Sequence, residues 1–182
     1  MGKYEVTQNQ WMKIMGKNPS KFKSGTNPVE KVNLKDAKKF IKKLNSQTGK
    51  EFMLPSEAQW EFACKGGEDT LYSGGNNVDS VAWYLSNSNG RTHSVGEKLP
   101  NAYGLYDMSG NVYEWCEDVY NENAYKKHSH ENPIYIDPSD SYHVIRGGGW
   151  DKLNRYVSCT NRYNSSRGDR RKYLGFRVIF NK

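Results

Sequence analysis

Two carboxylates flank a sharp turn in the middle of the chain, and their spacing suits a hard cation. Asp107 and Glu114 lie on either side of a Ser-Gly-Asn turn at 109–111, within the segment 104–115. Gly110 can adopt backbone conformations closed to other residues, so the chain can turn there and direct carbonyl groups inward. Several oxygens from a shaped loop are what Ca²⁺ prefers. The segment predicts either a calcium site or an Asn/Gly turn between two strands whose Asp and Glu are merely solvated.

The three cysteines suggest little metal or redox chemistry. Cys64, Cys116 and Cys159 are far apart and form no CxxC pair, so a zinc site is not expected. An odd number of cysteines does not support a disulfide framework, although one pair could form a bridge. We expect all three to be small buried core residues.

Other constellations lack a complete ligand or catalytic set. His128 and His130 are close enough in sequence to share a metal, but no third ligand is near, which favours a solvated loop. The glycine run 147–149 precedes a tryptophan and a loop instead of a helix start, so it does not predict a phosphate cradle. No Ser, His and Asp combination has supporting context.

The formal net charge of +7 comes from a Lys-rich N-terminal region and an Arg-rich segment at 162–177. Nucleic-acid-binding proteins often carry such a charge, but no zinc finger, helix-turn-helix or RNA-binding sheet motif accompanies it, so solvated faces explain it better. No apolar run reaches membrane-spanning length, and no apolar signal region follows Met1. The sequence therefore predicts no nucleic acid partner and no membrane span. It leaves open the oligomeric state and the compartment, which would be the cell surface or extracytoplasmic if a leader has been removed.

Three amphipathic helices precede the candidate cation site. Each begins with a capping residue followed three positions later by Gln or Asp, and each ends at a glycine. The capping residues are Thr7, Asn33 and Ser56, and the terminating glycines are Gly16, Gly49 and Gly66.

The rest of the chain is rich in loops, with a few short strands. Residues 68–138 are dense in Asn, Ser, Gly, Tyr and Pro, a pattern typical of functional loops or of loops fixed by a ligand. Strand-like runs lie at 52–54, at 144–150 before a glycine turn, and at 174–180. Helices followed by scattered strands indicate an α+β fold. The 182 residues match the size of a single domain, 1–182.

Five motifs occur in order: YEVT at 4–7, LPSEAQWE at 54–61, NAYGLYDMSGNVYEW at 101–115, RGGGW at 146–150 and GFRV at 175–178. Together they resemble the formylglycine-generating enzyme, or sulfatase-modifying factor, family. The resemblance covers almost the whole chain from Tyr4. It implies a C-type-lectin-like fold, loop-rich, with a small twisted antiparallel sheet and two to three helices. The family usually has one or two strands before the first motif, and these would be missing here.

The resemblance also implies a chemistry that this chain has lost. Catalytic members of the family convert a sulfatase cysteine into formylglycine with oxygen and copper, using two cysteines a few residues beyond the Arg-Gly-Gly turn. Copper(I) requires soft thiolate ligands. Here residues 151–158 contain no cysteine, and Cys159 comes later and alone. We therefore expect no catalytic residue and no copper. The alternative is a divergent formylglycine-generating enzyme or a related copper- or iron-dependent oxidase.

The calcium hypothesis is strengthened by the same resemblance. Calcium-binding relatives build a site around the stretch that corresponds to 104–115. Carried over to this chain, Asp107 and Glu114 would supply side-chain oxygens, and Gly110 and Val112 would supply backbone carbonyls. The spacing Asp-x-x-Gly-x-Val-x-Glu is intact, and the ion would be structural.

The segment 146–177 is the candidate ligand-binding region. Its Tyr, Ser, Asn and Gly content suits recognition, because Tyr gives rigid amphipathic area and small polar residues adapt to a partner. It also resembles the variable region of bacterial proteins that diversity-generating retroelements diversify on the same lectin-like scaffold. The candidate contact residues are Trp150, Asp151, Leu153, Asn154, Tyr156, Tyr163, Asn164, Ser165, Asp169 and Tyr173. We expect a non-catalytic protein that binds a protein or glycan here, and a plain solvated loop is the alternative.

Overall fold

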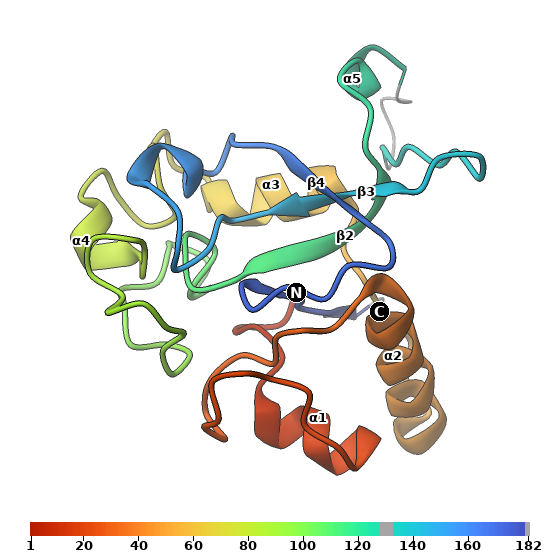
Figure 1. The fold of residues 1–182 in the computed structure, drawn as a ribbon. Helices are drawn as coiled ribbons and strands as arrows, with labels where there is room; N and C mark the ends of the chain where they lie inside the picture. The colour runs from red at the N-terminus through yellow and green to blue at the C-terminus, as the bar shows by residue number, and fades with distance from the viewer. Residues whose placement is uncertain (128–132, 181–182) are drawn as a thin grey trace.

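The three main helices form where the sequence predicts them. The structure is a computed structural model that describes residues 1–127 and 133–180 (Figure 1). The helices are α1 (Gln8–Met15), α2 (Leu34–Thr48) and α3 (Glu57–Lys65). Each begins with a reciprocal capping box and ends at a left-handed glycine, because these residues satisfy terminal N–H and C=O groups that a helix leaves unpaired.

Three shorter helical turns lie in the loops. They are α4 (Val78–Val81), α5 (Ala124–Lys127) and the 3₁₀ turn η1 (Asn154–Tyr156). None of the helices in the described part of the chain has the length and apolar character needed to cross a membrane. The histidine pair His128 and His130 lies outside the described residues.

A four-stranded sheet forms the centre of the molecule. Its order is β4 (Tyr163–Ser166), β3 (Tyr142–Arg146), β2 (Tyr113–Val119) and β5 (Leu174–Gly175). β2, β3 and β4 are antiparallel neighbours, but β5 runs parallel to β2, so the sheet is mixed where the sequence predicted an antiparallel one.

The strand predicted at 174–180 divides into two. Its second half, β6 (Ile179–Phe180), pairs with β1 (Phe52–Met53) in a separate ribbon. Between the two halves, the N-terminal segment takes the backbone bonds: Val6 N–H donates to Phe176 O, and Gly2 N–H donates to Val178 O. The strand is therefore interrupted by pairing with residues far away in the sequence, which periodicity cannot show.

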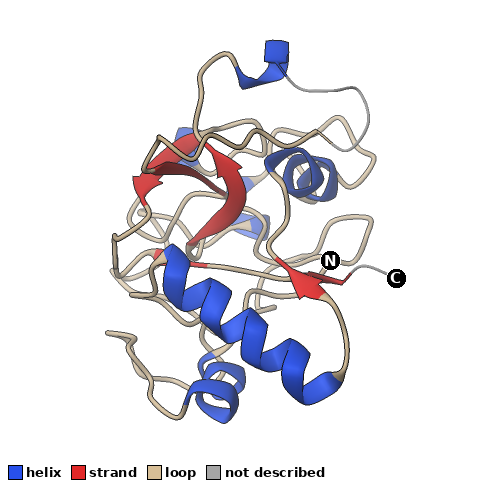
Figure 2. Cartoon of the chain, turned by 90° about the vertical axis from the view of Figure 1, so that its right-hand side faces the viewer, coloured by secondary structure: helices blue, strands red, loops and turns tan. Residues whose placement is uncertain are grey.

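Both faces of the sheet are covered, so β2 is buried along almost its whole length. Successive side chains of a strand point to opposite faces. Tyr113 and Trp115 join the apolar core beneath α1 and α2, whereas Cys116 joins Trp60 of α3 in a second core on the other face. Figures 1 and 2 show α3 on one side of the sheet and α1 and α2 on the other.

The three cysteines are buried, as predicted, and two of them form the one bridge that the sequence left open. Cys64 of α3 and Cys159 form a disulfide with their Cα atoms 5.6 Å apart, so Cys159 does not stand alone. They are 95 residues apart in sequence, and only the packing of α3 on the sheet brings them together. Cys116 is free and buried, as predicted.

This disulfide predicts a large effect of reduction on stability. A bridge that closes so long a loop restricts the unfolded chain strongly, by about 2–5 kcal/mol. We expect urea denaturation to show a loss of that size in Cys64→Ala/Cys159→Ala, and the same loss in the parent protein under reductant. Cys116→Ala is the matched control, because it should leave the response to reductant unchanged. A parent protein equally stable with and without reductant would contradict the bridge.

Candidate functional site

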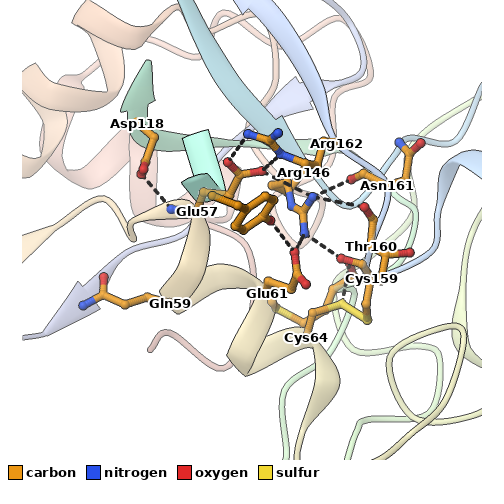
Figure 3. A network of polar contacts seen from close by, with 12 residues as sticks. Glu57, Gln59, Glu61, Cys64, Asp118, Arg146, Cys159, Thr160, Asn161 and Arg162 are labelled. Atoms are coloured by element: carbon orange, nitrogen blue, oxygen red, sulfur yellow. Dashed lines mark hydrogen bonds and ion pairs between the residues drawn. A yellow bond between two sulfur atoms is a disulfide. The ribbon is translucent and has the colours of Figure 1, made fainter. Parts of the chain in front are cut away.

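Strand β3 ends at Arg146, whose side chain is fully buried. Arg146 is ion-paired with Glu61 and lies 3.4 Å from Glu57, both on α3. Its Nη2 donates to Cys159 O at 2.7 Å, and its Nη1 donates to Asn161 O at 3.0 Å (Figure 3). Arg146 is the first residue of the Arg-Gly-Gly-Gly-Trp motif. Its side chain therefore binds the backbone at the end of the loop that this motif begins.

Glu57 shares its carboxylate between two arginines. Arg162 donates to it from Nε and Nη2, each at 2.7 Å, and Glu57 N–H in turn donates to Asp118 Oδ2 at 2.7 Å. Glu57 and Glu61 are one helical turn apart, so both carboxylates point to the same side. Two carboxylates, those of Glu57 and Glu61, are therefore paired with two guanidinium groups, those of Arg146 and Arg162.

Loop 147–158 is consequently fixed at both ends, by Arg146 at its start and by the Cys64–Cys159 disulfide at its end. Gly148 has a φ of +76°, and a Cβ there would lie 2.6 Å from Tyr156 O, so the turn requires glycine. Within the loop, Trp150 N–H donates to Asn111 O at 2.8 Å. That bond joins the loop directly to the turn between the two candidate calcium carboxylates.

The predicted contact residues fall into two groups. Trp150 and Ser165 are buried and support the surface: the Trp150 indole N–H donates to Lys172 O at 3.0 Å, and Ser165 Oγ donates to Asp169 Oδ2 at 2.9 Å. Tyr163, at 53%, and Leu153, at 41%, are exposed. Asn154 is also exposed, and the half-buried members are Asp151, Tyr156, Asn164, Asp169 and Tyr173.

A buried tyrosine that the sequence did not assign to this surface lies under it. The Tyr113 ring on β2 is 5.9 Å from the Tyr163 ring and 6.1 Å from the Tyr173 ring. Burial raises the pKa of its hydroxyl, and the neighbouring Tyr163 and Asp151 raise it further. Tyr113 lies in the motif 101–115, two positions before Trp115, so strand alternation puts both side chains on the same face of β2.

Lys152 also lies among these aromatic rings. Its ammonium is 4.5 Å from the centre of the Tyr173 ring and 3.5 Å from Asp151 Oδ1. That carboxylate oxygen is buried and has no hydrogen bond within residues 1–127 and 133–180. The loop therefore presents tyrosines, an amide and a carboxylate, with a lysine of its own beside them.

The candidate calcium carboxylates have different surroundings. Glu114 is fully buried, and Arg177 donates to both of its oxygens at 2.7 Å, while Trp60 Nε1 donates to Oε2 at 2.7 Å. Asp107 is also buried, and its Oδ2 accepts from Gly96 N–H at 2.7 Å. Glu114 is thus already neutralised by a cation of the chain itself.

Glu5 adds a third buried carboxylate, which the sequence did not identify as part of the site. It accepts from Asn111 Nδ2 at 2.9 Å and from Val112 N–H at 3.2 Å. Burial raises the pKa of Glu5 well above its ordinary value, and Asp107 and Glu114 raise it further. Burial also raises the pKa of Asp107 to about 6. Three carboxylates thus share one guanidinium, that of Arg177.

The turn itself has the backbone that a loop with inward oxygens needs. Asp107 and Asn111 both have a φ of +56°, and Gly110 has a φ of +85°, so three left-handed residues lie within five positions. A Cβ on Gly110 would overlap the Trp83 carbonyl. Asn111 N–H donates to that same carbonyl at 2.8 Å, so a hydrogen bond holds the turn close to the Trp83 backbone.

The carboxylates of Asp107, Glu114 and Glu5 are buried here, and carboxylate oxygen is the kind of donor that Ca²⁺ takes. Asp107 is the better side-chain donor, since both Glu114 oxygens bind Arg177. The Gly110 and Val112 carbonyls would complete such a site with Asp107. Across the described residues there is no group of three or more His, Cys, Asp or Glu side chains placed to ligate a metal.

Breaking the buried Glu114–Arg177 pair should cost more stability than breaking an exposed ion pair. Glu114→Gln leaves the Arg177 guanidinium buried without its countercharge, which costs about 3–5 kcal/mol. The matched control is Arg170→Ala, which removes the exposed Arg170–Asp36 pair and should cost less than about 1 kcal/mol. Urea denaturation of both variants measures the difference. Similar losses in the two would contradict the organising role of Glu114.

Comparison with known proteins agrees with this architecture. The domain model of the "Sulfatase-modifying factor enzyme 1-like domain" family matches residues 1–182. The chaperone protein LppX of Paenibacillus barcinonensis is 34% identical, over 82% of this chain and 68% of LppX. The formylglycine-generating enzyme of Thermomonospora curvata is 34% identical, over 57% of this chain and 41% of that enzyme.

A solved structure is similar over nearly the whole chain. Variable protein 1 of Treponema denticola superposes with a TM-score of 0.86 at 35% identity, covering 96% of this chain and 81% of that one. The fold is therefore the α+β, C-type-lectin-like fold of the formylglycine-generating enzymes. With both fold and motifs matched along its length, the chain belongs to the sulfatase-modifying factor enzyme 1-like family.

Proposed function

We propose that this protein is a non-catalytic binding member of its family, which recognises a protein or glycan through loop 147–158 and strand β4. One observation carries the proposal: the segment that follows the Arg-Gly-Gly-Gly-Trp motif is fixed at both ends and presents tyrosine and asparagine where an oxidase needs thiols.

The exposed side chains of this surface are suited to recognition. Tyr163 and Leu153 offer apolar area, and Asn154 offers an amide. Because Arg146 and the disulfide already order the loop, little conformational entropy remains to be lost on binding. A preordered surface of this kind favours a binding function.

The cysteines argue against the oxidase alternative. Cys64 and Cys159 form a disulfide, so neither is a free thiol. Cys116 is buried, and burial raises the pKa of its thiol well above the ordinary value, so it is neither exposed nor a thiolate. Conversion of a Cys-x-Pro-x-Arg peptide to its aldehyde in the presence of copper would nevertheless overturn the non-catalytic assignment.

The relatives and the disulfide support two finer proposals. Similarity to Treponema denticola variable protein 1 supports diversification of this segment by a retroelement, which a reverse transcriptase gene and a near-copy of the coding segment beside the gene would test. The Cys64–Cys159 bridge favours an oxidising compartment, and this agrees with recognition at the cell surface.

The recognition surface predicts which substitutions abolish binding. Glycan and protein arrays are probed with the parent protein and with Leu153→Ala/Tyr163→Ala, whose side chains are exposed. We expect the signals of the parent to fall at least tenfold in the double variant, because aromatic anchors dominate binding energy. Tyr103→Ala, an equally exposed tyrosine on another face, should leave them unchanged. Signals that survive the double variant would place recognition elsewhere.

We also propose that calcium binds at Asp107 and the Gly110 and Val112 carbonyls as a structural ion. Its support is the surplus of buried carboxylate around Arg177 and the left-handed turn at 107–111. A calcium ion there would supply positive charge that Arg177 alone cannot, and it would stabilise the turn to which Trp150 is bonded.

Calcium should therefore raise the melting temperature of the parent protein. At about 100 times its dissociation constant an ion stabilises by about 2.7 kcal/mol, a rise of roughly 5–10 °C for a chain of this size. Asp107→Asn should abolish the calcium-dependent rise, whereas Asp69→Asn, at an exposed site, should keep it. Glu114 variants are unsuitable, since they unpair Arg177. No rise in the parent would remove the calcium proposal.

A further inference from the structure

We propose that a basic pocket beside loop 147–158 binds a small oxyanion carried on a hydroxyl-bearing body, such as a sugar acid or a sugar phosphate. The pocket lies between the loop 21–27 and the loop 91–97, and its volume is about 570 Å³. Pockets of this size accommodate a small organic ligand. The inference does not depend on the proposed function of loop 147–158, because no residue of that loop lines the pocket.

The charge of the lining selects the ligand. Three cations, Lys21, Lys23 and Arg91, and a single carboxylate, Glu97, line the pocket, so cations outnumber carboxylates in its wall. A concave surface of one sign concentrates the field and raises the local concentration of ions of opposite charge. The pocket therefore favours an anion.

Arg91 is the principal candidate for anion binding. It is exposed, and across residues 1–127 and 133–180 its guanidinium has no hydrogen-bond or ion-pair partner. Guanidinium groups bind carboxylate and phosphate oxygens in pairs, with specific geometry. The Lys21 ammonium lies 5.5 Å from the centre of the Phe22 ring and can supply a second positive charge.

The walls of the pocket are fixed by buried polar groups. Phe22 O accepts from Gln8 Nε2 at 2.7 Å, and Phe22 N–H donates to the buried Glu30 carboxylate at 2.9 Å. The two loops are joined to each other, since Asn27 Nδ2 donates to Thr92 O at 3.0 Å and Val95 N–H donates to Thr26 O at 3.0 Å. A ligand therefore meets a largely preformed site.

Polar and aromatic groups beside the cations favour a sugar-like body. Thr92 lines the pocket, and its Oγ1 accepts from Asn27 Nδ2 at 3.0 Å. The half-buried Phe22 ring gives an apolar face against which a sugar ring can pack. Behind it lies Trp150, with its ring 5.4 Å away and perpendicular, so the pocket adjoins the base of loop 147–158.

Isothermal titration with four probes tests the proposal. They are glucuronate, glucose 6-phosphate, glucose and inorganic phosphate. We expect both sugar anions to bind, with glucose and inorganic phosphate at least tenfold weaker. Arg91→Ala should weaken sugar-anion binding about tenfold or more, the loss of a hydrogen bond to a charged group. Arg155→Ala removes another exposed arginine, which does not line the pocket, and should leave sugar-anion binding unchanged.

Two results would overturn the inference. One is the absence of sugar-anion binding in the millimolar range. The other is an affinity that Arg91→Ala leaves unaltered, or that inorganic phosphate matches. Circular dichroism and melting temperature confirm that the exposed-site variants fold. Tyr163→Ala should retain sugar-anion binding, so failure of loop recognition and failure of the pocket are distinguished by separate variants.

Discussion

The fully buried pair of Glu114 and Arg177 is the interaction on which the rest of the structure depends. It joins β2 to the C-terminal segment, and Arg177 also donates to Gly2 O at 3.1 Å and to Tyr106 O at 2.8 Å. Trp60 of α3 donates to the same carboxylate. One ion pair therefore connects the chain start, the central turn, α3 and the chain end. Few regular elements are needed, because buried side chains satisfy the irregular backbone.

A second network of buried charges holds the ends of loop 147–158 in the same way. Arg146 and Arg162 bind the two carboxylates of α3, and Arg146 also binds the carbonyls of Cys159 and Asn161. The first network fixes the turn at 107–111, and the second fixes the ends of the loop. Trp150 N–H, bonded to Asn111 O, links them. Together the two networks hold loop 147–158 rigidly against the rest of the molecule.

The sequence predicted the local structure well and the long-range partners poorly. Capping boxes and terminal glycines located α1, α2 and α3, because those signals act within a few residues. The motifs indicated the fold. The sequence could not show that Glu5 lies beside Asp107, that Cys64 meets Cys159, or that β5 pairs parallel to β2. Each depends on residues far apart in the chain. Trp150, predicted at the binding surface, is buried for the same reason: its neighbour Phe22 comes from a distant loop.

Hydrogen exchange of the parent protein tests most directly whether irregular backbone is held still here. The amides to follow are those of Asn111, Trp150 and Lys152, which lie outside the strands and donate to the carbonyls of Trp83, Asn111 and Gly149. We expect these amides to exchange as slowly as those of β2 and β3, since they open only with the core. Exchange at the rate of an unfolded peptide, while β2 and β3 stay protected, would contradict it.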